Sequence, residues 1–516
     1  MEAFLSRTPV FLALVGGLVL STLVLVILFP AVAMLPMAVA ILLWVLAKVP
    51  LRSPVLVLLT ILLTVDCAVE VPYSGLWQSP VSFLGRLFYV PLNNITHIPG
   101  LGFTLIDVSV FGLILLYIYR RAVGLKIDKP MTPLPKPLIN ALLLILVTIA
   151  WMYVWGVARG GDGRPAKWQL QKLLLMPMFV LLFTISIKGP EDFRLLGRII
   201  VWACFVKAFL GAFFIVFIVR PQGLYSEYAT THSDTVLYVT GLAIALSSWT
   251  EEPTWKNFRR MALVCGVILM GMNYNDRRLA YASFDQALVT MFLLSPWTRV
   301  KVYATRVGVA LLPLILAYIV IGWSNPTGFF SPVNTIKSMI VGEHNDTGEM
   351  DYRDVENFNL ISTWQRNPLL GTGYGHGFDV VMKLDDISHL FEDWRYHPHN
   401  SVLGLLAFGG ALGFSGVWMF VAVTMFFATR SYHRAHPPHW RAAALVCIAI
   451  VIAYTNQCFG DMGITSWYGM ILMALSVTIT GKLAILTGAW QPVRSPTPVE
   501  SAPLLGSSVQ EGGGRT

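Results

Sequence analysis

The sequence is poor in charge. Asp, Glu, Lys and Arg together make up 13% of its 516 residues, whereas hydrophobic residues make up 55%. Mean hydropathy is +0.65. A soluble domain carries roughly twice this charged fraction. The scarcity of charge therefore excludes a soluble globular protein and indicates a membrane protein.

Cysteine is also scarce, and the cysteines present do not cluster. The five residues are spread through apolar segments, at Cys67, Cys204, Cys265, Cys447 and Cys458. This spacing argues against a disulfide framework and against a zinc knuckle. We interpret these cysteines as small apolar packing residues.

A nucleic-acid-binding segment is missing, although the net charge is +9. The basic residues are distributed over many short loops, and no Lys/Arg-rich stretch is interleaved with aromatic residues. The net charge is therefore not a signal for nucleic-acid binding.

What the chain does contain is a series of apolar runs of about 20 residues, the length that crosses a hydrocarbon core. These runs lack the alternation of a membrane β-barrel, so only helices satisfy their backbone in lipid. The sequence predicts an all-α polytopic membrane protein with about 12–14 transmembrane helices. The spans are predicted at 9–29, 31–47, 54–70, 103–119, 137–157, 172–187, 198–219, 234–250, 260–273, 279–296, 306–323, 400–428, 441–459 and 464–488.

Basic residues set the predicted topology. With a cytoplasmic N-terminus, the short inner loops are rich in Lys and Arg, as the positive-inside rule requires. We expect an uncleaved first span, one membrane domain over residues 1–491, a long outer loop over 324–399 and a disordered cytoplasmic tail over 492–516. Residues 71–102 are assigned no span, and a re-entrant segment around Val81 to Leu92 is one interpretation of them.

This topology leaves an unusual set of cations on the outer side. They lie in one predicted loop, at span ends and in the long loop: Arg159, Arg164, Lys167, Lys172, Arg220, Arg277, Arg278 and Arg353. Guanidinium groups bind phosphate in a bidentate manner, so the set favours an anionic ligand. The alternative is that the cations reach lipid headgroups or pair with neighbouring acidic residues.

Three local patterns refine this prediction. Asn275 and Asp276 are expected to cap a helix opened by Arg277 and Arg278, near backbone N–H groups that suit phosphate. From Arg353 onward, Val355, Phe358, Ile361 and Trp364 recur at near-helical spacing, which predicts an amphipathic helix on the membrane surface. Pro368 and Gly371 should end it, and the alternate glycines Gly371, Gly373, Gly375 and Gly377 allow close backbone approach.

His399 is the best candidate for catalysis. It precedes the span that begins near Asn400, and the positive end of that helix favours a neutral ring able to accept a proton. Asn400 and Ser401 can orient the ring or a substrate. Two other interpretations remain: a structural histidine bonded to the loop, and a metal site using His389, Glu392, Asp393, His397 and His399. That spacing matches no compact metal-ligand motif, and no metal is predicted.

Several of these segments resemble the O-antigen ligase/polymerase superfamily. The resemblance rests on Asn367 to Gly375, on His399-Asn400-Ser401 followed by Gly409 to Gly413, and on Arg220 to Tyr225. It covers roughly residues 200–430 and includes Arg277, Arg278 and Arg353 at positions where the family carries basic residues. The pair Asn275-Asp276 departs from the usual start of the family helix, so the sequence does not decide which of Arg277 and Arg278 takes the family role.

The resemblance implies a GT-C-like glycosyltransferase of the bacterial inner membrane that needs neither metal nor nucleotide. Its donor would be a glycan on undecaprenyl diphosphate at the periplasmic face. Arg220, Arg277, Arg278 and Arg353 would bind the diphosphate, His399 would act as general base, and Asn400, Gly371, Gly373 and Tyr374 would orient the substrate. The acceptor would be lipid A core for a ligase, a lipid-linked glycan for a polymerase, or a protein hydroxyl for an O-oligosaccharyltransferase.

A transporter or flippase of lipid-linked saccharides is the alternative from a different class. Transporters place polar residues near the bilayer midplane, often in broken helices. This sequence places its charge at span ends and in one outer loop, which favours an enzyme. The extended length of the chain favours a polymerase over a ligase, but the sequence specifies neither the sugar, the acceptor nor the oligomeric state.

Overall fold

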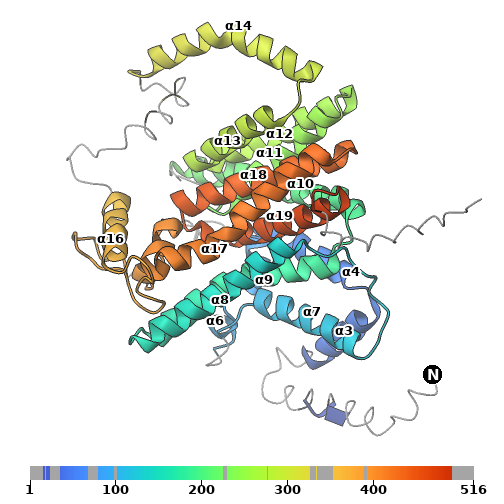
Figure 1. The fold of residues 1–516 in the computed structure, drawn as a ribbon, viewed down its shortest axis with the longest axis vertical. Helices are drawn as coiled ribbons and strands as arrows, with labels where there is room; N and C mark the ends of the chain where they lie inside the picture. The colour runs from blue at the N-terminus through green and yellow to red at the C-terminus, as the bar shows by residue number, and fades with distance from the viewer. Residues whose placement is uncertain are drawn as a thin grey trace, which may run out of the picture.

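The computed structural model describes residues 35–67, 79–97, 102–224, 229–275, 277–325, 352–388 and 392–490, with isolated positions between residues 16 and 23 and between 330 and 337. Figure 1 shows long helices packed side by side in a bundle. In these ranges the only strand-like contact is an isolated bridge between Pro91 and Thr104. The predicted all-α architecture is confirmed. The predicted first span (9–29, apart from isolated positions) and the tail over 492–516 lie outside the described residues.

The helices follow the predicted spans closely. Those of the first half are α3 (Leu35–Lys48), α4 (Arg52–Thr64), α5 (Pro80–Tyr89), α6 (Leu92–Thr96), α7 (Leu105–Ala122), α8 (Lys136–Ala158), α9 (Gly163–Ser186), α10 (Pro190–Phe213), the π-helix η2 (Phe214–Val219), the 3-10 turn η3 (Arg220–Gln222) and α11 (Asp234–Glu251). Those of the second half are α12 (Trp255–Asn275), α13 (Arg278–Leu294), α14 (Arg299–Gly322), α16 (Tyr352–Arg366), η5 (Trp394–Tyr396), α17 (Ser401–Arg434), α18 (Pro438–Gly460), η6 (Gly463–Thr465) and α19 (Trp467–Leu486).

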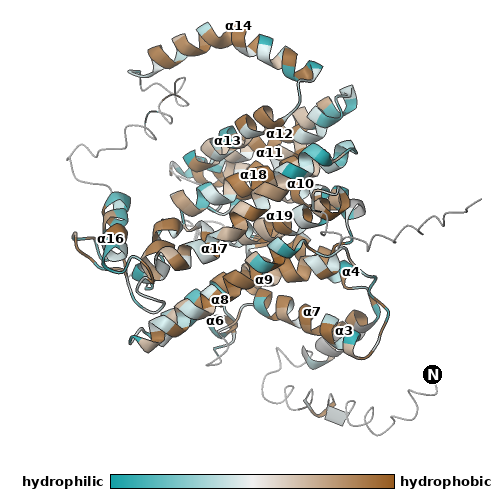
Figure 2. Cartoon of the chain, viewed as in Figure 1, coloured by the Kyte–Doolittle hydropathy of each residue, from teal (hydrophilic) through white to brown (hydrophobic). Residues whose placement is uncertain are grey.

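Seven helices of the described chain are long and apolar enough to cross a membrane, namely α8, α9, the α10–η2–η3 unit, α14, α17, α18 and α19. Burial separates the central from the peripheral ones: 89% of the apolar window of α19 is buried, against none of that of α14. Helix α19 packs against α9, α11, α17 and α18, whereas α14 stands apart from the bundle (Figure 1). The long helices are largely apolar (Figure 2), and many of their large apolar side chains are exposed, as expected for helices that contact lipid.

The two ends of the bundle carry different groups of turns. The end that we call the loop end carries residues 367–388 and 392–400, the α8–α9 and α18–α19 turns, and the first turn of α11. Asp162 donates its N–H to the Gly375 carbonyl, and Ser466 Oγ lies 2.9 Å from Ser233 Oγ. At the opposite end, Arg441 pairs with Glu251 and Lys482 donates to the Thr132 carbonyl. The loops that the topology prediction assigned to one side therefore do lie at one end of the bundle.

Helix α17 is broken inside its span. Gly410 has φ 60° and ψ −167°, a conformation that only glycine adopts readily. The segment after α16 inserts at this break and satisfies the backbone there. Four hydrogen bonds join them: Ala411 N–H to Pro368 O, Leu412 N–H to Leu369 O, Thr372 N–H to Ala407 O, and Gly373 N–H to Phe408 O. An interrupted helix at membrane depth is tolerated because protein covers its free backbone groups.

Several helices begin before their predicted spans, and the difference is largest for α9. Helix α9 begins at Gly163, so Arg164, Lys167 and Lys172 lie on its first turns and not in a loop before residue 172. Two of these cations lie near aromatic rings, Lys167 over Phe103 and Lys172 over Trp467, whereas Arg164 pairs with Glu392.

The uncertain segment between residues 71 and 102 contains two short helices. Helix α5 has 10 residues and α6 has 5, so neither is long enough to span a membrane. Tyr89 at the end of α5 donates to the Leu62 carbonyl at the end of α4, which holds α5 against the loop end of that helix.

Candidate functional site

His399 is held by a buried carboxylate on another helix. Its Nδ1 lies 3.2 Å from Glu356 Oε1, and its backbone N–H donates to Glu356 Oε2 at 3.0 Å. The Glu356 side chain is 2% exposed and that of His399 is 26% exposed. With Nδ1 turned to the carboxylate, Nε2 is the nitrogen available to accept a proton. The carboxylate would stabilise the imidazolium that forms, as in carboxylate–histidine pairs of hydrolases.

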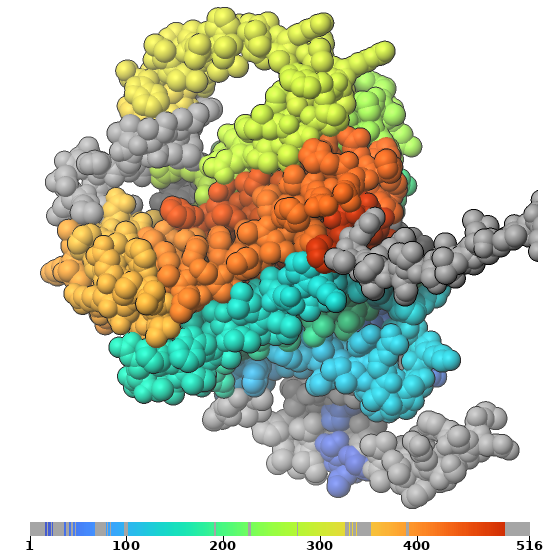
Figure 3. Space-filling view, in the orientation of Figure 1, coloured from blue at the N-terminus to red at the C-terminus, as the bar shows by residue number. Residues whose placement is uncertain are grey.

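Two helices create this pair. His399 precedes α17, whose first turn is capped by Asn400 through a 3.0 Å hydrogen bond from the Leu403 N–H. Glu356 lies on α16, which packs across the loop end of α17 (Figure 3). Asn400 is buried and serves as a helix cap, a structural role that the sequence analysis did not include. Its predicted role in orienting a substrate stays a prediction.

The helix predicted after Arg353 is present as α16, and its predicted position on the membrane surface stays a prediction. Phe358 and Ile361 are exposed, whereas Glu356, Asn359 and Thr363 are buried. The polar residues are buried because they bind the following segment: Asn359 Oδ1 accepts from the N–H of Val381 and Met382, and Thr363 Oγ1 accepts from Asp379. The local period could not reveal these partners, because they come from the segment that follows α16.

Two of the four predicted phosphate-binding arginines converge on the α18–α19 turn. Arg353 donates from Nη1 to the Gly460 carbonyl at 3.1 Å. Arg277 Nη2 lies 3.0 Å from His232 Nε2, and His232 Nδ1 lies 3.0 Å from Asp461 Oδ2. Burial by itself would raise the pKa of the Asp461 carboxyl, but the hydrogen bond and charge of His232, together with Arg353, lower it to about 2. Asp461 is thus an anion that positions the Arg277–His232 pair.

The other two arginines lie at the same end but make different contacts. Arg220 is exposed and lies 5.8 Å from the ring centre of Tyr274, on the last turn of α12. Arg278 is exposed and opens α13. A single cavity shared by Arg220, Arg277 or Arg278, and Arg353 stays a prediction.

The predicted cap of α13 is wrong. Arg277 is the N-cap residue and makes no side-chain capping bond. Asn275 belongs to the last turn of α12 and accepts a hydrogen bond from the Thr230 N–H instead. Asp276 lies outside the described residues.

The glycine-rich segment approaches other parts of the protein closely. A Cβ at Gly371 would lie 2.3 Å from the Phe408 carbonyl carbon of α17, and one at Gly373 would lie 2.3 Å from Gly156 Cα of α8. Tyr374 donates its N–H to the Met152 carbonyl. These residues wedge the segment between α8 and α17, so the close backbone approach that the sequence predicted is made to helices. Direct orientation of a substrate by Gly371, Gly373 and Tyr374 stays a prediction.

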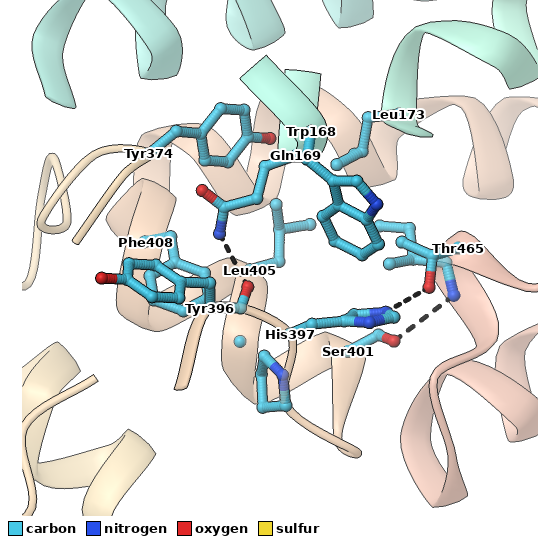
Figure 4. A pocket seen from close by; sticks show the side chains of 13 residues that line it. Trp168, Gln169, Leu173, Tyr374, Tyr396, His397, Ser401, Leu405, Phe408 and Thr465 are labelled. Carbon is cyan, nitrogen blue, oxygen red and sulfur yellow. Dashed lines mark hydrogen bonds between the residues drawn. The ribbon is translucent and has the colours of Figure 1, made fainter. Parts of the chain in front are cut away.

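Figure 4 shows a cavity whose lining includes His397, Pro398 and Ser401, which flank the candidate base in the chain. His397 lines it, close to Trp168, with 4.7 Å between ring centres, and it is bonded to Thr465 Oγ1. Burial, together with Lys172, lowers the pKa of His397 to about 3, so its ring is neutral. The lining residues are Trp168, Gln169, Leu173, Tyr374, Tyr396, His397, Pro398, Ser401, Gly404, Leu405, Phe408, Ile464 and Thr465.

The metal alternative gains no support from the described residues. Within them, no three His, Cys, Asp or Glu side chains come together in a way that would hold a metal ion. His389, one of the proposed ligands, lies outside the described part of the chain.

Sequence reasoning missed Glu356, His232 and Asp461. Each pairs with a residue far away in the chain: Glu356 is 43 residues from His399. No motif spacing connects such pairs, and Glu356 by itself resembles any acidic residue on a surface helix. The only local signal was the long polar interruption itself.

The family model for O-antigen ligase matches residues 261–418. The match supports the O-antigen ligase superfamily for this segment. The match covers less than a third of the chain and includes Arg277, Arg353, Glu356 and His399, whereas Arg220, His232 and Asp461 lie outside it. It supports a glycosyl-transferring membrane enzyme of the O-antigen ligase/polymerase type, acting in general on lipid-linked glycan and lipid A core substrates. A comparison with curated proteins gives no match.

Proposed function

We propose that the chain transfers a glycan from undecaprenyl diphosphate to an acceptor hydroxyl at the periplasmic face of a bacterial inner membrane. The observation that carries the proposal is the His399–Glu356 pair, which lies at the same end of the bundle as Arg277 and Arg353. A base and a set of guanidinium groups are the two functions that transfer from a diphosphate requires.

The proposed reaction is a single displacement. His399 Nε2 takes the proton of the acceptor hydroxyl, and the acceptor oxygen forms a bond to the anomeric carbon. The bond from that carbon to the diphosphate oxygen breaks, and the electron pair leaves with the diphosphate. Arginine side chains stabilise the negative charge that develops there, and the anomeric configuration inverts.

Two features support a catalytic assignment of His399 over a structural one. Its side chain keeps access to solvent, and its partner is a buried carboxylate instead of a backbone carbonyl. A histidine that served only to hold the loop would not require a carboxylate, whose burial costs free energy. His397 fits the structural role better, because it is neutral and engaged with Thr465.

The full-length protein in liposomes tests the proposal. With undecaprenyl diphosphate oligosaccharide as donor and rough lipopolysaccharide or a second lipid-linked oligosaccharide as acceptor, mass spectrometry should find a transferred glycan. Activity should persist with EDTA and without nucleotide. Glu356→Gln should lower turnover by about 10–10³-fold without changing protein levels, whereas Glu392→Gln, which alters an exposed ion pair with Arg164, should be near wild type.

We prefer a polymerase to a ligase, because the long chain leaves room for a second lipid-linked glycan. A deletion strain distinguishes them. Loss of a polymerase should leave single repeat units on lipid A core or on the carrier, whereas loss of a ligase should leave long polymers on undecaprenyl diphosphate and bare core.

Two observations favour a transporter: the break in α17, and the buried ion pair of Lys207, midway along the α10–η2–η3 unit, with Asp66. Only backbone groups and the Thr372 side chain supply polar atoms at the inserted residues 368–373, and no ionisable side chain is among them. Transporters usually place ionisable groups at such breaks. Movement of lipid-linked glycan across liposome membranes without formation of a product would favour transport and contradict the enzymatic proposal.

A further inference from the structure

The cavity beside His399 has the character of a sugar subsite. Four aromatic side chains line it, from Trp168, Tyr374, Tyr396 and Phe408. Aromatic faces pack well against the C–H faces of a sugar ring, since both surfaces are apolar and flat. Most of the polar side chains at the wall are already engaged: Gln169 donates to the Tyr396 carbonyl and His397 is bonded to Thr465. The cavity therefore recognises shape and an apolar face more than hydroxyl groups.

The cavity adjoins the loop segment that contains the candidate base, His399. Its lining residues His397, Pro398 and Ser401 lie on either side of His399 in the sequence. The side chains of His397 and His399 reach different neighbours: His397 contacts Trp168 of α9, whereas His399 bonds Glu356 of α16. Arg353 also lies on α16. His399 is therefore bonded to α16, the helix that carries Arg353, whereas its chain neighbour His397 lines the cavity.

A cation lies near Trp168, one of the residues that line the cavity. Lys172 Nζ lies 3.7 Å from the ring centre of Trp467 and 5.8 Å from that of Trp168. In the described part of the chain, Lys172 is held by these rings and not by an ion pair. A cation held by aromatic faces keeps its N–H groups able to bind an anion, whereas one paired with a carboxylate does not.

We propose that the cavity between α9 and α17 binds the terminal sugar of the acceptor glycan, with Lys172 binding a neighbouring phosphate or carboxylate of that acceptor. The inference rests on the proposed function, because it takes the acceptor to be a membrane-anchored anionic glycan. It adds the place where the acceptor binds and assigns its recognition to Trp168 and Lys172, two residues outside the donor arginines.

Binding, measured apart from turnover, tests the subsite. The full-length protein in phosphatidylcholine nanodiscs is titrated with fluorescent rough lipopolysaccharide and, separately, with a lipid-linked oligosaccharide. Trp168→Ala should weaken binding of at least one probe about tenfold or more, and Lys172→Gln should weaken it several-fold. Trp168→Phe, which keeps an aromatic face, should bind nearly as the wild type does.

Two control variants change residues that do not line the cavity. Trp151→Ala removes an exposed tryptophan of α8 that stacks on Trp155, and Lys126→Gln removes an exposed lysine of the α7–α8 connection, so neither should change binding. Unchanged binding of both probes by a stably folded Trp168→Ala protein would overturn the subsite, whether or not the protein transfers glycan. Intact, Trp168-dependent binding without any turnover in the wild type would contradict the proposed function alone.

A lipid-headgroup role for Lys172 is a separate outcome of the same experiment. If the effect of Lys172→Gln disappears in nanodiscs that contain phosphatidylglycerol, the cation binds bilayer headgroups and its assignment to the acceptor is overturned. If the effect persists in both membranes, the acceptor supplies the anion.

Discussion

Carboxylates at the two ends of the bundle have different partners. At the opposite end they bind arginine, as in Arg441–Glu251 and Arg120–Asp128. At the loop end, Asp379 and Glu392 also bind arginine and Asp66 binds Lys207, but Glu356 and Asp461 bind histidine. An arginine–carboxylate pair stays charged at physiological pH, whereas a histidine can gain or lose a proton there. The opposite end is thus built for permanent attachment, and the loop end holds groups that can take part in proton transfer.

The two ends also differ in how the segments that connect the helices are held. The α18–α19 turn at the loop end is bound by Arg353 and Ser401 as well as by His232. Residues 367–375 enter the bundle and complete the broken helix α17. At the opposite end, Lys482 reaches the Thr132 and Thr184 carbonyls without any such insertion. Rigid support from several segments is what a site needs to hold its reacting groups in place.

The largest expected effect is on the activity of topology reporters. A fused reporter is either active or silent, depending on whether its end of the bundle faces the periplasm. Alkaline phosphatase fused at Leu384 should be active and a fluorescent protein there dark, since the opposite end carries the basic connections. Fusions at Lys126 should show the reverse. The opposite pattern at both sites would invert the topology and remove the proposed periplasmic site.

Loss of the base should have the next largest effect. His399→Ala should lower glycan transfer by about 10²–10⁴-fold, the usual contribution of a general base, with unchanged amounts in the membrane. His397→Ala should be milder. His433→Ala, on the last turn of α17 at the opposite end, is the matched control and should retain activity. Near-normal turnover of purified His399→Ala protein would refute the assignment.

Charge-conserving changes of the arginines should have intermediate effects. Arg277→Lys and Arg353→Lys should each reduce transfer by about tenfold, because an ammonium group cannot reproduce the bidentate contact of a guanidinium. The loss should appear mainly as a higher KM for the lipid-linked donor. Arg434→Lys, at the opposite end of α17, should have little effect. Equal losses in all three variants would mean that arginine geometry matters only for folding.

The smallest expected effect is on stability in acid. Because the pKa of His397 in the folded protein is about 3, below its ordinary value of 6.5, the unfolded chain binds more protons between these values. The stability contributed by the neutral ring is therefore complete above pH 6.5 and decreases as pH falls toward 3. The midpoint of thermal unfolding should fall by a few degrees over this range, and His397→Gln should reduce the slope. An unchanged slope in that variant would show that other groups dominate.

The sequence by itself determined the all-α membrane class and the approximate position of most described helices. It predicted about 12–14 spans, whereas seven helices of the described chain are long and apolar enough to cross a membrane. Apolar length determines the class and these positions, because each helix must satisfy its own backbone in lipid. It also singled out His399 and the arginines, through a resemblance that the family match over residues 261–418 supports. The cap of α13 was predicted wrongly, since Asn275 accepts a hydrogen bond from the Thr230 N–H, a partner that local sequence does not show.

Only the tertiary structure decided the partners. Glu356 meets His399, Asp461 meets His232, and residues 368–373 complete α17 at Gly410 because α16 folds across the end of the bundle. Trp168, His397 and Thr465 enclose one cavity although they come from three distant segments. No local sequence pattern predicts these contacts. Helix propensity and hydrophobic periodicity describe the helix to which a residue belongs, whereas its contact partner depends on how the helices pack.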